Sequence, residues 1–264
     1  MAYSDGSLQL TTAFIILIAA LLIQIGTNFA NDYFDCIHGA DSGERIGPLR
    51  VTQAGLIKPD VMKLAFITVF SLFFLIGLYL ARLGGWPIMA VGTISILLGI
   101  LYTGGPYPFG YYGLGDIIVL IFFGPVAVGG TYYLQTFNLN FSVILAGLAP
   151  GLFSTAILTV NNLRDIHTDG QAGKRTLAVR FGASFARGEY LFAIVLACLV
   201  PAFLLLVDRS HPYSLAAVLV FLFTFPSIRA VFSEKIGPHL NQALAHTGKA
   251  LFLYSVVFSI GWNL

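Results

Sequence analysis

Apolar stretches long enough to cross a membrane recur along the whole chain and decide its fold class. A spanning helix needs roughly 20 largely apolar residues. Hydrophobic residues make up 57% of the 264 residues and charged ones only 10%, against ~25% charged in a soluble domain. The runs are continuously apolar rather than alternating with period two, so we expect an all-α polytopic membrane bundle forming one domain over 1–264. Eight spans are predicted, at about 8–30, 61–83, 86–103, 115–135, 141–160, 188–207, 213–232 and 247–263.

Charge balance and cysteine content exclude several classes of protein. A formal net charge of +2, from 14 basic and 12 acidic residues, is too small to neutralise a nucleic-acid backbone, so nucleic-acid binding is excluded as a primary role. Cys36 and Cys198 fit neither a disulfide framework nor a zinc pattern. The first span does not resemble a signal peptide, because the leader before it has no basic residue and no small-residue cleavage site follows it, so we expect this span to remain in the mature chain.

Basic residues lie almost entirely in alternate loops. All but two of the 14 Lys and Arg residues fall in or beside loops that would share one side of the membrane; the two exceptions are Arg82 and Arg209. Because cytoplasmic loops carry an excess of Lys and Arg, we expect these loops in the cytoplasm and both chain ends on the opposite side. The loops are 31–60, 104–114, 161–187 and 233–246.

Two acidic motifs end predicted spans. NFANDYFDCIHGAD ends the first span and NNLRDIHTD ends the fifth, so four spans separate them and both emerge on the same membrane face. In the second motif Asn161, Asp165 and Asp169 are spaced i, i+4 and i+8, and they form one polar stripe if the helix continues.

The first motif predicts a matching polar surface. Asn31 and Asp35 are spaced i, i+4, Gly39 is expected to break the helix, and Asp41 returns from a loop. Helix C-termini favour cations, and unpaired carboxylates near a bilayer are costly, so two such motifs indicate function.

The ligand chemistry of the motifs suits magnesium. Carboxylate and amide oxygens are hard ligands for Mg²⁺, which commonly bridges to substrate phosphates. We therefore expect Mg²⁺ and a diphosphate between the two motifs. Basic residues after each motif, in ERIGPLR and GKRT, would neutralise the charge that builds on a departing diphosphate. They are Arg45, Arg50, Lys174 and Arg175, of which Arg50 and Lys174 are the strongest candidates.

The two acidic motifs resemble those of a known family. NDYFD followed by NNLRDIHTD resembles the paired Asn/Asp motifs of the UbiA superfamily of intramembrane prenyltransferases, over essentially the whole chain. The stretches RIGPLR, YTGGPYPFGYYGLGD and GKRTLAVRFG are most similar to the branch that prenylates 1,4-dihydroxy-2-naphthoate in menaquinone synthesis. Members usually have nine spans, so the resemblance implies a further span before residue 8.

The resemblance also implies a mechanism. It implies an Mg²⁺-dependent enzyme of a bacterial or archaeal plasma membrane, in which a polyprenyl diphosphate ionises and alkylates the naphthoate ring with loss of its carboxyl group. One metal-diphosphate site would hold Asn31, Asp35 and Asp41, and the other Asn161, Asp165 and Asp169.

Three further residues are candidates for the substrates. The rings of Tyr33 and Tyr102 lie near the polar face, where they would stabilise an allylic cation. Asp116 of GLGD opens a predicted span, where it either caps the helix or hydrogen-bonds the acceptor.

Two alternatives remain open on the sequence alone. The first is prenylation of another aromatic acceptor, such as 4-hydroxybenzoate or homogentisate. The second is a transporter, whose site would lie near the membrane midplane rather than at span ends.

Overall fold

The computed structural model describes residues 1–39, 46–47, 49–233 and 235–264, and every regular element within them is a helix. The helices group into two compact units, which we describe separately. We call residues 9–115 and 167–176 the α1 unit. Residues 1–8, 116–166 and 177–264 form the α6 unit.

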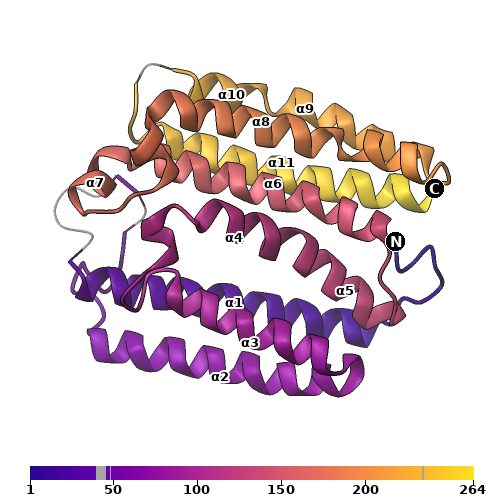
Figure 1. Ribbon diagram of the computed structural model, residues 1–264, viewed down its shortest axis with the longest axis horizontal. Helices are drawn as coiled ribbons and strands as arrows, with labels where there is room; N and C mark the ends of the chain where they lie inside the picture. The colour runs from indigo at the N-terminus through magenta and orange to yellow at the C-terminus, as the bar shows by residue number, and fades with distance from the viewer. Residues whose placement is uncertain (40–45, 48, 234) are drawn as a thin grey trace. The chain divides into compact units, whose positions relative to one another are not determined.

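Three apolar helices, two of them long, build the α1 unit and lie side by side (Figure 1). They are α1 (Leu10–Ile37), α2 (Pro59–Gly84) and α3 (Trp86–Leu101). Phe66 and Phe70 of α2 pack on Ala30 of α1, and Gly26 allows the close approach because an added Cβ would meet the Phe70 ring at 2.6 Å. The helix α1 stops before Gly39, whose φ of +62° lies in the left-handed region, so the expected break is confirmed.

The α6 unit packs around α6, which extends from Phe141 to Arg164. Asn140 begins this helix by accepting a hydrogen bond from the Val143 N–H at 2.9 Å. Phe153 of α6 and Tyr190 of α8 are fully buried in the core. The elements of the unit besides α6 are α4 (Gly115–Ile121), η2 (Phe122–Val126), α5 (Ala127–Thr136), α8 (Leu177–Val207), η3 (Pro212–Leu219), α9 (Val220–Phe223), α10 (Phe225–Val231) and α11 (Leu240–Asn263).

Two short helices flank the polar motifs: η1 (Phe109–Tyr112) in the α1 unit, and α7 (Ile166–Gln171), whose first residue belongs to the α6 unit and the rest to the α1 unit. Both follow the ends of long apolar helices. They therefore position loop residues rather than membrane-spanning ones.

Among the described residues, six helices are long and apolar enough to cross a membrane, or seven if the bent segment 212–231 counts as one. The chain is thus an integral membrane protein with an all-α bundle. The predicted span at 86–103 is a helix of only 16 residues, about 24 Å, which is short of a ~30 Å hydrocarbon core. The predicted span at 213–232 is bent by 40°. The sequence therefore predicted helices at both places, but two full straight spans are not found there.

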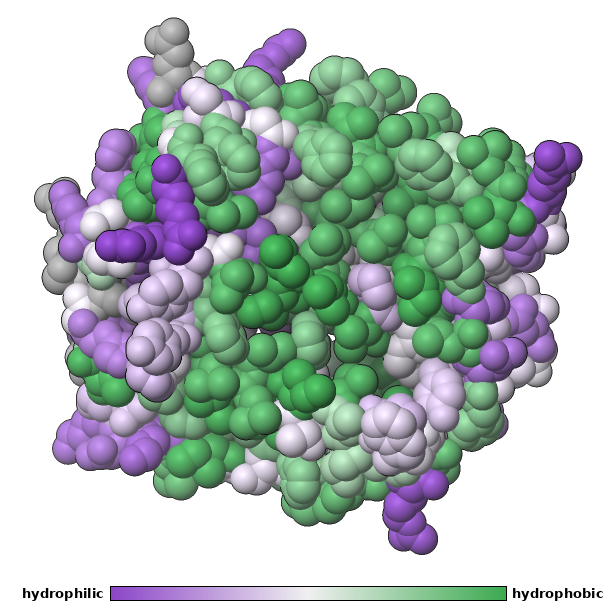
Figure 2. Space-filling view, in the orientation of Figure 1, coloured by the Kyte–Doolittle hydropathy of each residue, from purple (hydrophilic) through white to green (hydrophobic). Residues whose placement is uncertain are grey.

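The outer faces of the helices suit a lipid environment. On α2, Leu64 and Leu75 are 65% and 60% exposed. Figure 2 shows hydrophobic residues over most of the visible surface, with hydrophilic residues gathered near helix ends. Exposed apolar surface on this scale is expected where lipid, not water, covers the helix.

Candidate active site

Asp35, in the last turn of α1, is the centre of a group of charged and polar side chains in the α1 unit. Its side chain is almost fully buried. Arg50 donates from Nη2 to Asp35 Oδ2 at 3.2 Å, and the Tyr111 hydroxyl donates to Oδ1 at 2.9 Å. Lys174 Nζ lies 3.7 Å from the same Oδ1. The carboxylate is thus held by two cations and a phenol, which compensates for its removal from water.

Lys174 links this carboxylate to a second one. Its Nζ is 3.6 Å from Asp169 Oδ1 and 4.9 Å from the centroid of the Tyr111 ring. The backbone N–H of Arg175 donates to the Tyr111 carbonyl at 2.7 Å, which fixes the loop that carries Lys174. We call Asp35, Arg50, Tyr111, Asp169 and Lys174 the Asp35 cluster.

Asn31 and Asp32 lie one turn earlier on α1. Asn31 Oδ1 accepts a hydrogen bond from the Thr103 hydroxyl at 2.9 Å, so the YTGGP stretch positions the first motif. Asp32 is 6% exposed, and none of the described residues donates to its Oδ1. A buried carboxylate oxygen without a donor is what a bound cation or its water would satisfy.

A depression of about 500 Å³ opens beside the Asp35 cluster. Tyr111 connects the two, because it lines the depression and its hydroxyl donates a hydrogen bond to Asp35. The lining residues are His38, Gly105, Pro106, Pro108, Tyr111, Tyr112, Gly173 and Arg175.

The second motif lies in the α6 unit and is organised by Arg164. This side chain is 1% exposed and donates from Nε to Asp165 Oδ1 at 2.8 Å and from Nη2 to Asn161 Oδ1 at 2.7 Å. Its Nη1 donates to Asn241 Oδ1 of α11 at 2.7 Å. Arg164 therefore neutralises Asp165 and fixes the amide of Asn161 at the end of α6.

The continuous stripe predicted for the second motif is wrong. The helix α6 ends at Arg164, and Asp165 follows with φ −97° and ψ 10°. Asp169 lies on α7, in the α1 unit, where Lys174 contacts it. The i, i+8 relation depended on an unbroken helix, and the structure turns the chain at Asp165 instead.

The remaining candidates have other surroundings. Tyr33 packs against Phe34 and Phe66, with ring centroids 5.1 and 5.5 Å away. Tyr102 ends α3, and its ring lies so close to Gly110 that an added Cβ would be 2.9 Å from it. The predicted sites Asp41 and Arg45 lie outside the described residues.

Asp116 lies in the first turn of α4 and is 5% exposed. Its carboxylate hydrogen-bonds its own backbone N–H, but no described residue donates to Oδ1. Helix capping therefore gives a hydrogen-bond partner to only one of the two carboxylate oxygens of Asp116.

The sequence analysis did not include three residues that belong to these sites: Tyr111, Arg164 and Asp32. Asp32 and Arg164 stand inside the motifs themselves, so their positions were a usable signal. Tyr111 is 76 residues from Asp35, and no spacing rule connects the two.

The donors fit magnesium in kind. No group of three or more His, Cys, Asp or Glu side chains converges within the described residues. Asp32 nevertheless offers a buried oxygen without a donor, and Asp35 and Asp169 both lie against one cation, the Lys174 ammonium. Mg²⁺ keeps several waters and shares substrate phosphates, so it needs only one or two carboxylates.

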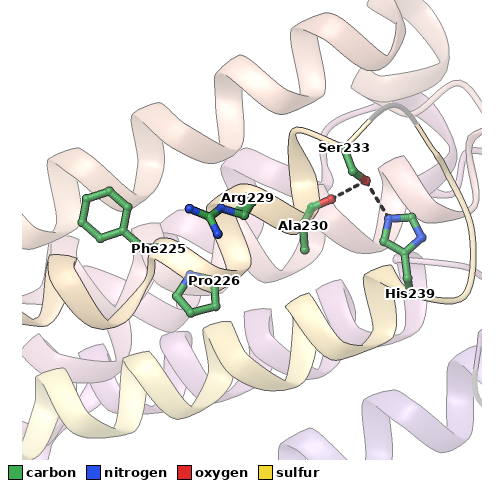
Figure 3. Close-up of a pocket in the computed structure, with 6 residues that line it drawn as sticks. All are labelled: Phe225, Pro226, Arg229, Ala230, Ser233 and His239. Atoms are coloured by element: carbon green, nitrogen blue, oxygen red, sulfur yellow. Dashed lines mark hydrogen bonds between the residues drawn. The ribbon is translucent and has the colours of Figure 1, made fainter.

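A second depression, of about 520 Å³, lies in the α6 unit beside α10 (Figure 3). The Ser233 hydroxyl donates to the Ala230 carbonyl at 2.8 Å and hydrogen-bonds His239 Nε2 at 2.9 Å. Of the predicted site residues that the structure describes, none lines it. Its lining residues are Phe225, Pro226, Arg229, Ala230, Ser233 and His239.

Together these features define an integral membrane protein with Asn/Asp motifs at the ends of apolar helices and with buried or partly buried cations beside the carboxylates. Comparison with known proteins gives its family. The model of the UbiA prenyltransferase family matches residues 1–256, and the chain belongs to this family of enzymes.

Individual relatives agree with this placement. The chain is 38% identical to a 1,4-dihydroxy-2-naphthoate octaprenyltransferase of Haemophilus influenzae, covering 93% of this chain and 82% of the relative. It is 37% identical to the protein of that name from Escherichia coli, covering 99% and 87%. A solved structure described as a UbiA homolog from Archaeoglobus fulgidus bound to DMAPP and Mg²⁺ superposes with a TM-score of 0.65 at 15% identity, covering 98% of this chain and 92% of that one. This last likeness shows the fold.

Proposed function

We propose that the chain transfers a polyprenyl group from polyprenyl diphosphate to 1,4-dihydroxy-2-naphthoate with decarboxylation, giving a precursor of menaquinone. The observation that carries this proposal is the Asp35 cluster, in which Lys174 and Arg50 are held on carboxylates at a helix end. The two relatives named above, both called 1,4-dihydroxy-2-naphthoate octaprenyltransferase, support the choice of acceptor.

Lys174 and Arg50 would bind the diphosphate. Their side chains are 15% and 22% exposed, so both are partly desolvated yet reachable from outside the cluster. A cation in a low-dielectric setting stabilises the charge on a leaving diphosphate more strongly than one in water. Arg175, whose backbone bonds Tyr111, lines the adjoining depression and would assist at its edge.

Mg²⁺, when bound, would neutralise further diphosphate charge. In the α1 unit Asn31, Asp32, Asp35 and Asp169 would hold it, together with Asp41 from outside the described residues. In the α6 unit Asn161 and Asp165 would do so, oriented by Arg164.

The reaction itself breaks the C1–O bond of the prenyl diphosphate and forms a bond from C1 to the ring carbon that carries the carboxylate. The ring then expels its carboxyl group as CO₂, and the electron pair of that bond restores aromaticity. The protein contributes by keeping water from the allylic cation, which the apolar helices favour, and by ring faces such as those of Tyr33 and Tyr102.

We further propose how the chain lies in the membrane. Eight segments would cross the bilayer if the 16-residue α3 and the bent segment 212–231 are counted. The motif ends would face the cytoplasm, because most Lys and Arg residues fall in the loops that follow these ends, and such loops are usually cytoplasmic.

The experiment that tests this function offers several acceptors to one preparation. Membranes containing the protein receive labelled polyprenyl diphosphate, Mg²⁺ and either 1,4-dihydroxy-2-naphthoate, 4-hydroxybenzoate or homogentisate. We expect a decarboxylated, prenylated naphthoate product. A prenylated 4-hydroxybenzoate that keeps its carboxyl group, with the naphthoate untouched, would contradict the acceptor and leave prenyl transfer standing. The transporter alternative is set aside, since the family is one of enzymes.

A further inference from the structure

Asp116 and Glu189 place two carboxyl groups inside apolar helices of the α6 unit. Asp116 lies on α4 and is 5% exposed, while Glu189 is half-buried on α8. Ionisable groups in spanning segments are costly and mark functional sites by default. The Asp116 Oδ1 is buried, and nothing in the described part of the chain donates to it. An acceptor left in this state indicates a ligand that brings its own donor.

The two carboxyl groups belong to one polar network across three helices. Glu189 hydrogen-bonds the side chain of Thr159, and its negative charge repels that of Asp116. The Thr159 hydroxyl is 2.9 Å from the Thr155 carbonyl, and the Thr155 hydroxyl is 3.3 Å from the Asp116 carbonyl. The network thus joins α4, α6 and α8. We call the two acids the Asp116–Glu189 pair.

The backbone around the pair is rigidly held. An added Cβ on Gly124 would lie 2.7 Å from the Gly147 carbonyl oxygen, and one on Gly151 would collide with the Leu120 carbonyl oxygen. Directly after α4 the chain forms a π-helical turn, Phe122–Val126, a feature frequent at functional sites. Close backbone packing therefore fixes α4 against α6 and leaves Asp116 little freedom to find another donor.

The depth of the pair suits the second substrate. Thr159 lies six residues before Asp165 on the same chain segment, so it is about 9 Å deeper along the α6 axis than the second motif. A diphosphate bound at Asp165 would direct its prenyl carbon into the membrane, toward this depth.

We propose that Asp116 accepts a hydrogen bond from a ring hydroxyl of the aromatic acceptor, and that the neighbouring negative charge of Glu189 makes it a stronger acceptor. This inference rests on the proposed function and adds the acceptor's binding group to it. A hydroxyl that donates to a carboxylate enriches the ring in electrons and so favours attack by its carbon. The hydroxyl keeps its proton, because the electron pair released with CO₂ restores the aromatic ring without a base.

The test compares two ring compounds in the full-length enzyme. We expect wild-type protein to bind 1,4-dihydroxy-2-naphthoate at least about tenfold more tightly than 2-naphthoate, which lacks both hydroxyls. A hydrogen bond to a charged group is strong enough to produce a difference of this size. The acceptor KM and the inhibition constant of 2-naphthoate measure this ratio. Asp116→Asn should reduce it to about threefold or less, Glu189→Gln should reduce it partly, and both should leave the KM for the prenyl diphosphate unchanged.

Asp60→Asn provides the matched control, since Asp60 is exposed at the start of α2. It should keep the wild-type ratio. If Asp116→Asn fails to fold, Glu189→Gln decides the question. The inference is overturned if every folded variant among Asp116→Asn and Glu189→Gln keeps the wild-type ratio of the two binding constants. In that case Asp116 would bind water instead of the acceptor. Wild-type protein that never prenylates the naphthoate would instead refute the proposed function, so the two failures are distinguishable.

Discussion

Replacing Lys174 by Met gives the sharpest test of the Asp35 cluster. Lys174 Nζ lies 3.7 and 3.6 Å from oxygens of Asp35 and Asp169. At an effective dielectric constant near 20, two unit charges at such a separation attract by about 4 kcal/mol each, before desolvation and solvent screening reduce the net value. The lysine is therefore well placed to bind a diphosphate that carries several negative charges.

The expected loss follows from the hydrogen bond that the ammonium would make. A hydrogen bond to a charged group contributes about 1.5–3 kcal/mol, so Lys174→Met should lower kcat/KM for the prenyl diphosphate about 10- to 150-fold. The acceptor KM should change by less than about twofold. Lys174→Arg keeps the charge and should recover part of the loss. Steady-state kinetics with each substrate varied in turn measures both effects.

Two controls separate binding from charge balance. Lys63→Met makes the same substitution at an exposed position of α2 and should leave the kinetics unchanged. Lys174→Met combined with Asp169→Asn removes the ammonium and one of its carboxylates. If Lys174 served only to neutralise Asp169, the second change would restore activity. Restored activity, or a folded Lys174→Met enzyme with unchanged donor kinetics, would refute the assignment.

Three other predictions concern the motifs and the helix packing. Asp35→Asn and Asp165→Asn should each lower turnover by at least ~10²-fold in correctly inserted protein, because each removes charge from an electrostatic site; near-normal turnover in both would sink the metal assignment. Tyr111→Phe removes one hydrogen-bond donor from the buried Asp35 carboxylate and should cost about 1–3 kcal/mol of stability, while kcat/KM of the folded protein for the prenyl diphosphate should fall about tenfold; folded protein with unchanged kcat/KM would make the role of Tyr111 structural. Gly151→Ala would press a Cβ against a backbone carbonyl of α4 and should cost about 1–3 kcal/mol of stability, seen as a lower midpoint of thermal unfolding; Gly130→Ala has open space and should not, so equal midpoints would argue against the tight packing.

The positions of the helices followed from the sequence because a bilayer demands long uncharged runs. The prediction was incomplete for two helices, whose length or straightness depends on local backbone geometry. The helix α3 has 16 residues, and the segment 212–231 bends by 40° at Thr224, just before Pro226 near the start of α10. Hydropathy records neither the exact helix end nor a bend, because both depend on packing and on backbone hydrogen bonds.

The motifs were also visible in the sequence, but the partners of their side chains were not. The spacing of Asn31 and Asp35 predicted that they share a helix face, and the sequence placed Lys174 beside the second motif, but it did not predict the contact of Lys174 with Asp35. The hydrogen bond from Tyr111 depends on the path of the loop after α3, which no periodicity describes. Arg164 looked like one more basic residue at a span end, whereas burial makes it the partner of Asp165.

Product analysis decides whether the chain performs Mg²⁺-dependent prenyl transfer to a dihydroxynaphthoate. Purified protein in lipid bilayers is incubated with labelled polyprenyl diphosphate and 1,4-dihydroxy-2-naphthoate, with Mg²⁺, with a chelator, and with Mg²⁺ restored after chelation. We predict a labelled, decarboxylated naphthoate product that disappears with the chelator and returns with Mg²⁺, while Asp35→Asn protein forms little of it. Product formation at an equal rate under chelation, or no naphthoate product from folded protein that binds the diphosphate, would contradict the account.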